Sequence, residues 1–417
     1  MIYLPQICPQ PDWHGIIPEI SDHSTADTSF WISCYRKGYT SIHSNINVER
    51  VHGAQKLKIR GENEVDVEYI NSRTLKASCP KIGVKDAIIH APRREWKSPR
   101  SKPILAIDAT SDGQLYAYSS EQHIVVAALG DNETRQMIMQ GHLADVTAVR
   151  FFPSNQVLLS GASDFRAKIW SIQDGSNPVT LTGHTAGITD LAIVSRGKNV
   201  LTSSRDGTIR LWHCGTGSTI SVLGNYNVPV TTMTLESLPS NYKPADQAQL
   251  DEREFETADK MILVGLNDGS VRGIHLGTKQ EFFSIQSGYD KVSALKYDTK
   301  SSILLVATMN GLVQAYELVD PSKPRLQWQR SDHAVTALVI HRTADDALLA
   351  YVSNADGSIY CTNDLISVMK DDGDLALSTE YSGNELEPIN SIVLAATESD
   401  DKTQILCCNR EGYIKVY

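Results

Sequence analysis

A turn signal that recurs along most of the chain constrains its fold more than any other sequence feature. Seven turns of the Asp-Gly type, or close variants of it, each separate two short runs rich in Val, Ile and Leu. They begin at Asp112, Asp164, Asp206, Asp268, Asn310, Asp356 and Glu411. Repeats of about 40–45 residues with such a turn before a short strand are typical of a β-propeller, in which each repeat forms one four-stranded blade. Seven turns therefore predict an all-β protein whose main domain is a seven-bladed propeller.

Two of the repeats align with each other without a gap. Residues 146–170 match residues 188–212, shifted by 42 positions. Each repeat has a His 22 positions before its turn Asp, a hydroxyl side chain four positions before it and a Trp six positions after it. These residues are His142, Ser160, Asp164 and Trp170 in one repeat, and His184, Thr202, Asp206 and Trp212 in the other. This pattern resembles the WD repeat.

The resemblance to the WD repeat implies that each set of four side chains forms a hydrogen-bonded structural column, from Trp through Ser or Thr and His to Asp. Buried polar groups must be paired, so such a column stabilises the fold by roughly 1 kcal/mol per bond. A His with a Ser and an Asp could also indicate a hydrolase triad. Because the set recurs at the repeat spacing, the structural role is favoured. We expect no enzyme activity and no cofactor.

Charge and cysteine content narrow the range of partners. Lys and Arg number 39 against 49 Asp and Glu, a formal net charge of -10. This excess of acidic residues argues against nucleic acid and anionic membranes as general partners. The seven cysteines are scattered without metal-ligand spacing, which is typical of reduced thiols in the cytoplasm or nucleus. We expect a monomer.

The end of the chain predicts how the ring closes. Only residues 413–417 follow the last turn, so blade 7 lacks its outer strand. An open edge is a liability that closed propellers avoid. Counting back from Asp112, residues 84–90 and 104–109 are predicted as the first two strands of blade 1, and residues 74–79 as the strand that completes blade 7. This predicts a propeller over residues 72–417 and a small β-rich domain over residues 1–71.

Acidic residues collect in the turns on one face of blades 4 to 7. We call this set the acidic rim: Asp268, Asp290, Asp332, Asp356, Glu385, Glu387 and Glu411. These blades lack the complete column, so their turn carboxylates are expected to be available to a basic protein partner. A competing partner site lies in an insertion of blade 4, on the other face, at Asp251, Glu252 and Glu254. A basic stretch at residues 93–102 is expected on a loop of that other face.

Several short stretches also resemble one family of WD-repeat proteins. They are Pro11-Asp12-Trp13, Arg150-Phe151-Phe152-Pro153-Ser154, Ser204-Arg205-Asp206-Gly207-Thr208, Trp212-His213-Cys214-Gly215 and Cys407-Cys408-Asn409-Arg410. Together they resemble the proteasomal ATPase-associated factors. The resemblance implies an assembly chaperone of the proteasome regulatory particle, the 19S base. Such a chaperone binds the C-terminal domain of a base ATPase subunit, accompanies assembly intermediates and is absent from the finished proteasome.

Two other functions remain open at this stage. A substrate receptor of a ubiquitin ligase would use the same propeller, but it usually adds a helical adaptor-binding motif, which residues 1–71 do not show. A ribosome- or RNA-processing scaffold would explain the basic stretch at residues 93–102 but not the acidic rim. Which ATPase subunit is bound, and through which face, does not follow from the sequence.

Overall fold

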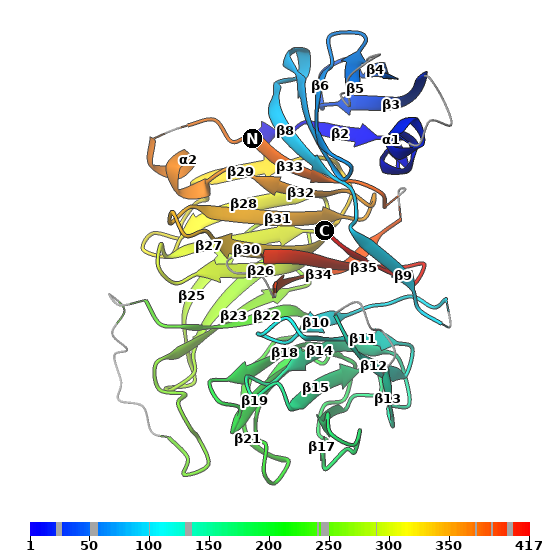
Figure 1. Cartoon of the computed structure of the whole chain (residues 1–417). Helices are drawn as coiled ribbons and strands as arrows, with labels where there is room; N and C mark the ends of the chain where they lie inside the picture. The colour runs from blue at the N-terminus through cyan, green and yellow to red at the C-terminus, as the bar shows by residue number, and fades with distance from the viewer. Residues whose placement is uncertain are drawn as a thin grey trace.

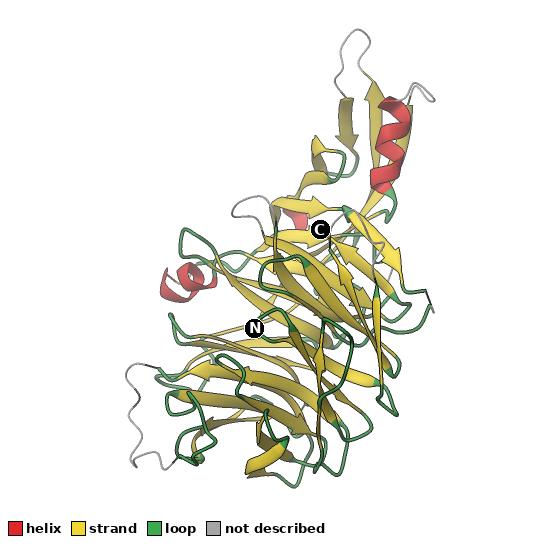
Figure 2. Ribbon diagram, turned by 60° about the horizontal axis from the view of Figure 1, so that its bottom comes forward, coloured by secondary structure: helices red, strands yellow, loops and turns green. Residues whose placement is uncertain are grey.

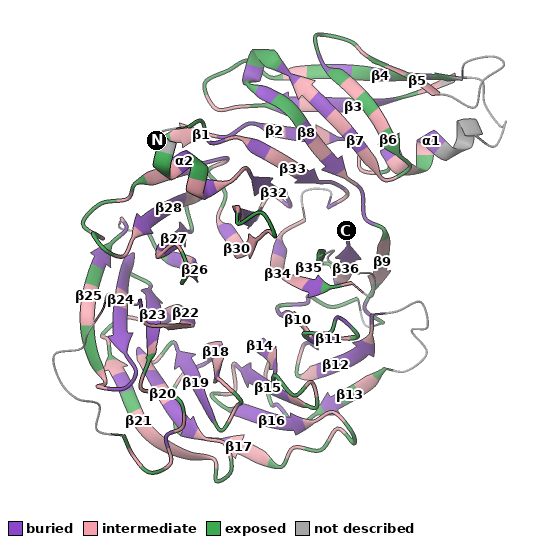
Figure 3. Ribbon diagram, turned by 60° about the vertical axis from the view of Figure 1, so that its left-hand side comes forward, coloured by how far each residue is buried: buried purple, intermediate pink, exposed green. Residues whose placement is uncertain are grey.

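Seven small β-sheets are arranged in a ring in the computed structural model of the chain (Figures 1 and 3). The structure describes residues 1–21, 27–50, 57–99, 101–129, 136–239, 242, 250–288, 290–371, 373–384, 387–397 and 403–417. Figure 3 shows one strand of each sheet facing the centre of the ring, and these inner strands are β10, β14, β18, β22, β26, β30 and β34. The predicted seven-bladed WD40 β-propeller is confirmed.

Blades 1 to 4 are regular four-stranded antiparallel sheets. Blade 1 contains β10 (Ile107–Ala109), β11 (Leu115–Ser120), β12 (His123–Ala128) and β13 (Met137–Gln140). Blade 2 contains β14 (Val146–Phe151), β15 (Val157–Ala162), β16 (Ala167–Ser171) and β17 (Val179–Leu181). Blade 3 contains β18 (Ile188–Val194), β19 (Asn199–Ser204), β20 (Thr208–His213) and β21 (Ser218–Asn225). Blade 4 contains β22 (Val230–Ser237), β23 (Lys260–Leu266), β24 (Ser270–His275) and β25 (Gln280–Gln286).

Blades 5 to 7 each receive strands from the N-terminal part of the chain. Blade 5 contains β26 (Val292–Asp298), β27 (Ile303–Thr308), β28 (Leu312–Glu317) and β29 (Leu326–Gln329), and β1 (Ile2–Tyr3) pairs with β29. Blade 6 contains β30 (Val335–Arg342), β31 (Leu348–Asn354), β32 (Ile359–Thr362) and β33 (Leu377–Tyr381). Blade 7 contains β34 (Ile389–Ala396), β35 (Thr403–Asn409), β36 (Tyr413–Val416) and β9 (Arg94–Lys97).

Middle strands are apolar on both faces because each blade packs between two neighbours. Ile303–Thr308, the strand β27, is buried at every position, and its sequence ILLVAT is a continuous run rather than an alternation of apolar and polar residues. Such runs are typical of strands with no solvent-facing side. Outer strands differ: β25 buries only Ile285 and exposes Gln280, Glu281, Ser284 and Gln286. The sequence of each strand thus reflects its radial position in the ring.

The strand that closes the ring is not the one that the sequence predicted. The outer strand of blade 7 is β9, which pairs antiparallel with β36 so that Trp96 lies opposite Ile414 (Figure 1). Residues 74–79 form β7 instead, between β6 (Asp66–Asn71) and β8 (Val84–His90) in the extended sheet of blade 6. The prediction that residues 74–79 complete blade 7 was therefore wrong. The basic stretch at residues 93–102 accordingly includes this closing strand and is not a loop within blade 1.

The error arose from one misplaced turn in blade 1. The Asp112-Gly113 turn joins β10 to β11, the first and second strands. The turn between the second and third strands is at Glu121, which has no Asp-Gly signal. The sequence predicts Asp112 in the turn between the second and third strands of blade 1. Residues 104–109 were therefore predicted as the second strand, although they contain β10, the first.

The N-terminal residues form an additional layer against blades 5 and 6. A separate sheet contains β2 (Gln6–Pro9), β3 (Asp27–Tyr35), β4 (Ile42–Arg50) and β5 (Leu57–Gly61), and α1 (Trp13–Ser21) packs on it (Figures 1 and 2). A short 3-10 helix (Pro80–Ile82) precedes β8, which pairs in parallel with the outer strand β33 of blade 6. The predicted division at residue 71 falls between β6 and β7, which are paired strands of one sheet.

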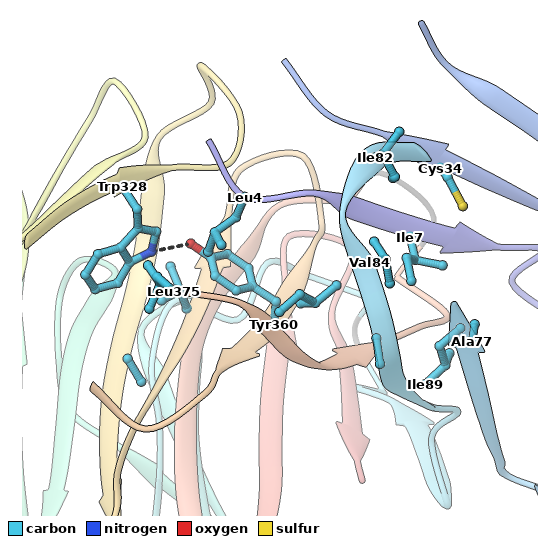
Figure 4. Packing of buried hydrophobic residues seen from close by; sticks show 14 of the residues in the cluster. Leu4, Ile7, Cys34, Ala77, Ile82, Val84, Ile89, Trp328, Tyr360 and Leu375 are labelled. Carbon is cyan, nitrogen blue, oxygen red and sulfur yellow. Dashed lines mark hydrogen bonds between the residues drawn. The ribbon is translucent and has the colours of Figure 1, made fainter. Parts of the chain in front are cut away.

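One hydrophobic core joins the N-terminal layer to the propeller. Leu4 and Ile7 of the N-terminal segment share this core with Trp328 of blade 5 and Tyr360 of blade 6 (Figure 4). The Trp328 indole Nε1 donates a hydrogen bond of 3.1 Å to the Tyr360 hydroxyl inside it. The second helix, α2 (Leu365–Asp371), contributes Leu365. Neither of the described helices is long and apolar enough to cross a membrane.

Candidate functional site

One face of the ring collects the predicted partner-binding carboxylates. Successive strands in a blade are antiparallel, so the turns between second and third strands emerge on the same face as the loops that join one blade to the next. We call this the turn face. Asp268, Asp356 and Glu411 lie in turns of the first kind, and Asp290, Asp332 and Glu387 lie in loops of the second kind.

Two side-chain columns brace the turn face in blades 2 and 3. In blade 3 the Trp212 indole donates to Thr202 Oγ1 at 2.8 Å, His184 Nε2 lies 2.7 Å from the same hydroxyl, and His184 Nδ1 lies 2.8 Å from Asp206 Oδ2. Blade 2 repeats this arrangement with Trp170, Ser160, His142 and Asp164 at 2.8, 2.7 and 2.9 Å. The hydrogen bonds predicted from the WD pattern are therefore present in both blades.

Burial distinguishes these columns from a hydrolase triad that is open to a substrate. The His184 side chain is 1% exposed, and Thr202 is fully buried. Burial lowers the pKa of His184. Burial also raises the pKa of Asp206, but hydrogen bonds from Thr208, the Thr185 amide and His184 outweigh it and hold the pKa at about 2. A substrate would have no access to the hydroxyl, so the column serves as a link between strands.

The acidic rim is only partly available to a partner. Asp268, Asp290, Asp332 and Glu411 are exposed, and Glu387 is half-buried. The Asp356 side chain is 10% exposed, and its carboxylate accepts hydrogen bonds from the Ser358 amide and hydroxyl and from Ser331. Burial raises the pKa of Asp356, but these bonds outweigh it and lower the pKa overall. Asp356 is thus engaged in its own turn. Glu385 lies outside the described residues.

Some rim carboxylates have partners that the sequence did not indicate. Lys37 Nζ, on the loop between β3 and β4, lies 2.8 Å from Asp332 Oδ1. Asn310 Nδ2 donates to Asp290 Oδ2 at 2.7 Å. The expectation that the turn carboxylates are available to a partner is therefore not met at Asp332, which pairs with Lys37. Lys37 is almost 300 residues away in sequence, and only the packing of the N-terminal layer brings the two together.

A polar cavity adds two further carboxylates to the rim at blade 7. The cavity has a volume of about 260 Å³, and Glu387 and Glu411 line it together with Asp12 and Glu95. Asp12 precedes helix α1, and Glu95 lies on the closing strand β9. Lys415 Nζ, at the same cavity, lies 3.4 Å from Glu95 Oε2. Sequence reasoning missed Glu95 because it assigned the closing strand to the wrong residues. It missed Asp12 because only the packing of the N-terminal layer brings this residue to blade 7.

The competing site in the blade-4 insertion is mainly structural. The Glu254 side chain is 2% exposed and pairs with Lys279 Nζ at 2.5 Å. Asp251 is held by Arg253, whose hydrogen bonds lower the pKa of that carboxyl. Of the three predicted acids, only Glu252 is exposed.

The same insertion is also anchored to blade 3. The side-chain amide of Asn199 donates to the Arg253 carbonyl at 2.9 Å, and its oxygen accepts from the Phe255 amide at 2.7 Å. The described part of the insertion thus serves mainly to link blades 3 and 4.

Comparisons with known proteins agree with this architecture. The family model for the WD domain, G-beta repeat, matches residues 133–171 and 175–213, which contain β13 of blade 1, all of blade 2 and the first three strands of blade 3. The chain is 29% identical over 388 residues to Proteasomal ATPase-associated factor 1 of Homo sapiens, and the match covers 93% of both chains. The protein of the same name from Bos taurus matches to the same extent. The chain is therefore similar over nearly its whole length to the proteasomal ATPase-associated factors, and part of it matches the WD repeat.

A shorter match points to the same group of proteins. The 26S proteasome regulatory subunit RPN14 of Saccharomyces cerevisiae is 50% identical over 44 residues, which is 11% of each chain.

Charged side chains in the central channel of this WD-repeat protein form contacts between neighbouring blades. A cavity of about 430 Å³ is lined by all seven inner strands. Asp108 of blade 1 accepts a hydrogen bond from the Phe151 amide of blade 2 at 2.8 Å, and Asp190 of blade 3 accepts one from the Met233 amide of blade 4 at 3.0 Å. Arg150 Nη2 lies 3.6 Å from Asp190 Oδ1. These contacts join neighbouring inner strands and stabilise the ring.

No metal site is evident in the part of the chain that the structure describes. No group of three or more His, Cys, Asp and Glu side chains there could hold a metal ion. All seven cysteines are unpaired thiols, and five of them are buried. Burial raises the pKa of Cys361 and Cys407 to about 12, so these thiols are poor nucleophiles.

Proposed function

We propose that this protein is an assembly chaperone of the proteasome regulatory particle. It binds the C-terminal domain of a base ATPase subunit through the exposed part of its acidic rim and leaves before the proteasome is complete. The observation that carries the proposal is the relationship to the proteasomal ATPase-associated factors, which extends over 93% of both chains. Because the match is not confined to the two regular repeats, it includes blades 4 to 7, where the rim lies.

The rigidity and charge of the turn face support this proposal. Local hydrogen bonds hold the rim turns, such as the bond that the Ser270 amide donates to Asp268 Oδ1 at 3.0 Å, so little conformational entropy is lost on binding. Asp268, Asp290 and Glu411 present carboxylates to solvent. A specific complex of standard size buries on the order of 800 Å² on each partner, and complementary charges at its edge mainly speed association. The partner surface is therefore expected to be basic.

A charge-reversal experiment tests the rim. Asp268→Lys, Asp290→Lys and Glu411→Lys are combined in the full chain, and binding to the isolated C-terminal domains of the base ATPases is measured by biolayer interferometry. The dissociation constant for the cognate domain should rise at least tenfold. All three side chains are exposed, so the melting temperature should fall only slightly, through loss of the hydrogen bonds that Ser270 donates to Asp268 and Asn310 donates to Asp290. Asp332 is left intact because Lys37 pairs with it, and Asp356 because its side chain is only 10% exposed.

Glu252→Lys is the matched control, since Glu252 is exposed but lies in the blade-4 insertion on the opposite face. It should leave the dissociation constant unchanged. Loss of binding with Glu252→Lys alone would move the interface to the insertion. Unchanged binding in both variants would refute the electrostatic account, and failure of the wild type to bind any of the ATPase domains would refute the proposed function itself.

A further inference from the structure

The turn of blade 2 lacks the glycine that occupies the equivalent position in five other blades. In blades 3 to 7 the second residue of the turn is a glycine in the left-handed region. These glycines are Gly207, Gly269, Gly311, Gly357 and Gly412, with φ between +83° and +86°. In blade 2 the same position is Phe165, with φ of +68°. A side chain with a Cβ is disfavoured in this region, so Phe165 introduces strain that the sister blades avoid.

Packing does not explain this strain. The Phe165 side chain is 46% exposed, and it belongs to none of the hydrophobic clusters formed by the described residues. The other described residues that have positive φ and are not glycine are all polar or charged, which makes Phe165 the one aromatic among them. Strained residues that persist without a packing contribution concentrate at functional sites.

A second exposed apolar residue is anchored to the residue that precedes Phe165. Leu143 is 69% exposed, and its amide donates a hydrogen bond of 2.9 Å to Asp164 Oδ2. Asp164 is the residue before Phe165 and belongs to the column of blade 2. The column therefore fixes the backbone of both apolar residues. In blade 3 the two equivalent positions are Thr185, whose amide donates to Asp206, and Gly207. The apolar pair is specific to blade 2.

Basic side chains flank the pair on the same face. Arg166 is exposed and follows Phe165 directly. Arg205 is exposed in the turn of blade 3, where its amide donates to the Gly187 carbonyl at 3.0 Å. Gly187 in turn lies against Ser163, in the turn that contains Phe165. One exposed acid, Asp145, also lies here. Two guanidinium groups against one carboxylate leave the surroundings basic, unlike the acidic rim.

We infer that Phe165 and Leu143, with Arg166 and Arg205, form a binding hot spot for a protein segment that presents an apolar side chain next to a carboxylate. Hot spots typically combine an aromatic anchor with arginine and a fixed backbone. A protein is favoured over nucleic acid because the chain carries a net charge of -10 and the acidic rim shares this face. The assigned partner, the C-terminal domain of a base ATPase, rests on the proposed function above. The hot spot would add a second contact with that partner. This contact would be mainly apolar, whereas the contact at the acidic rim is electrostatic.

Phe165→Gly is the most informative variant because it introduces the glycine that blades 3 to 7 have at this position. It should unfold at the same temperature as the wild type or higher, since the backbone strain is relieved. Its dissociation constant for the cognate ATPase domain should nevertheless rise at least tenfold, mainly through faster dissociation. If Phe165 served folding alone, the same change would lower the melting temperature and leave binding unaffected.

Two further substitutions define the chemistry of the hot spot. Leu143→Ser should weaken binding in the same direction, whereas Val319→Ser, at a side chain 70% exposed in the loop between β28 and β29 on the opposite face, should not. Arg166→Glu should lower the association rate constant and make this rate less dependent on salt concentration, as expected for the loss of a flanking charge. Val319→Ser is the control because Val319 is an apolar residue as exposed as Leu143.

The possible failures are distinguishable. If the wild type binds an ATPase domain and Phe165→Gly binds it equally well, the hot spot is refuted and the proposed function stands. If the wild type binds none of the domains, the proposed function is refuted and the partner assigned to the hot spot falls with it. If Val319→Ser weakens binding as much as Leu143→Ser, general loss of apolar surface is responsible and the hot spot is again refuted.

Discussion

Asp206→Ala tests how much one side-chain column contributes to the stability of a blade. The Asp206 carboxylate accepts hydrogen bonds from four donors: His184 Nδ1 at 2.8 Å, the Thr185 amide at 3.0 Å, and the Thr208 amide and hydroxyl at 2.9 and 2.7 Å. Alanine leaves the buried imidazole without its acceptor, while the amides near the surface can turn to water. A buried donor left unpaired costs about 1–3 kcal/mol, so a total of roughly 2–3 kcal/mol is expected.

The control is Asn310→Ala, at the equivalent turn of blade 5. Asn310 accepts bonds from the Thr308 hydroxyl and the Leu312 amide, but it is exposed, and Val306 stands where the column has its hydroxyl. Asn310→Ala should therefore lower the free energy of unfolding clearly less than Asp206→Ala does. Urea denaturation at pH 7, followed by intrinsic fluorescence, compares the midpoints of the two variants with the wild type. Equal shifts of the midpoint would refute the assignment of a stabilising role to the column.

The pH dependence of Asp206→Ala gives a second check on the same reasoning. The pKa of Asp206 is about 2 in the folded state against an ordinary 3.8, so its contribution is present above pH 4 and is lost as the pH falls from about 4 to 2. The difference in stability between the wild type and Asp206→Ala should therefore be smaller at pH 3 than at pH 7. A difference that does not change with pH would contradict a role for the ionised carboxylate.

Two other substitutions probe the ring closure and a buried ion pair. Trp96→Ala on the closing strand should destabilise the protein by about 3 kcal/mol or more because Trp96 packs against the core between blades 7 and 1. The control Trp31→Ala should cost less stability because Trp31 is 43% exposed. Equal melting temperatures of the two variants would contradict closure of the ring by β9. Glu380→Gln replaces the carboxylate that pairs with the fully buried Arg330 by a neutral side chain of the same size. Burial raises the pKa of Glu380 to about 7 against the opposing effect of Arg330, so the wild type should lose stability as the pH rises from about 4.5 to 7. The melting temperature of Glu380→Gln relative to that of the wild type should therefore be higher at pH 8 than at pH 5. An equal effect at both pH values would show that Glu380 stays ionised.

Local signals determined most of the propeller. The Asp-Gly turns mark where a chain can reverse with φ above zero, and the short apolar runs between them form strands that are buried on both faces. Both signals act within one repeat, so they are visible without knowledge of the fold. The two columns are equally local: His184, Thr202, Asp206 and Trp212 lie within 29 residues and occupy one blade. For the same reason the seven blades and both columns could be predicted from the residues alone.

The closing strand and the composition of the rim were decided by tertiary structure. No local signal indicates that β9 rather than β7 pairs with β36, because the partners are separated by more than 300 residues and any short strand could satisfy the open edge. The hairpin at Glu121 has no Asp-Gly signal, which shifted the strand assignment before it. Lys37 reaches Asp332 only because the N-terminal layer packs on blades 5 and 6. Exposure was likewise invisible, since Glu254 and Glu252 differ in burial although they are two residues apart. A sequence specifies which groups are charged or apolar, but the packing of distant segments determines which of them remain at the surface for a partner.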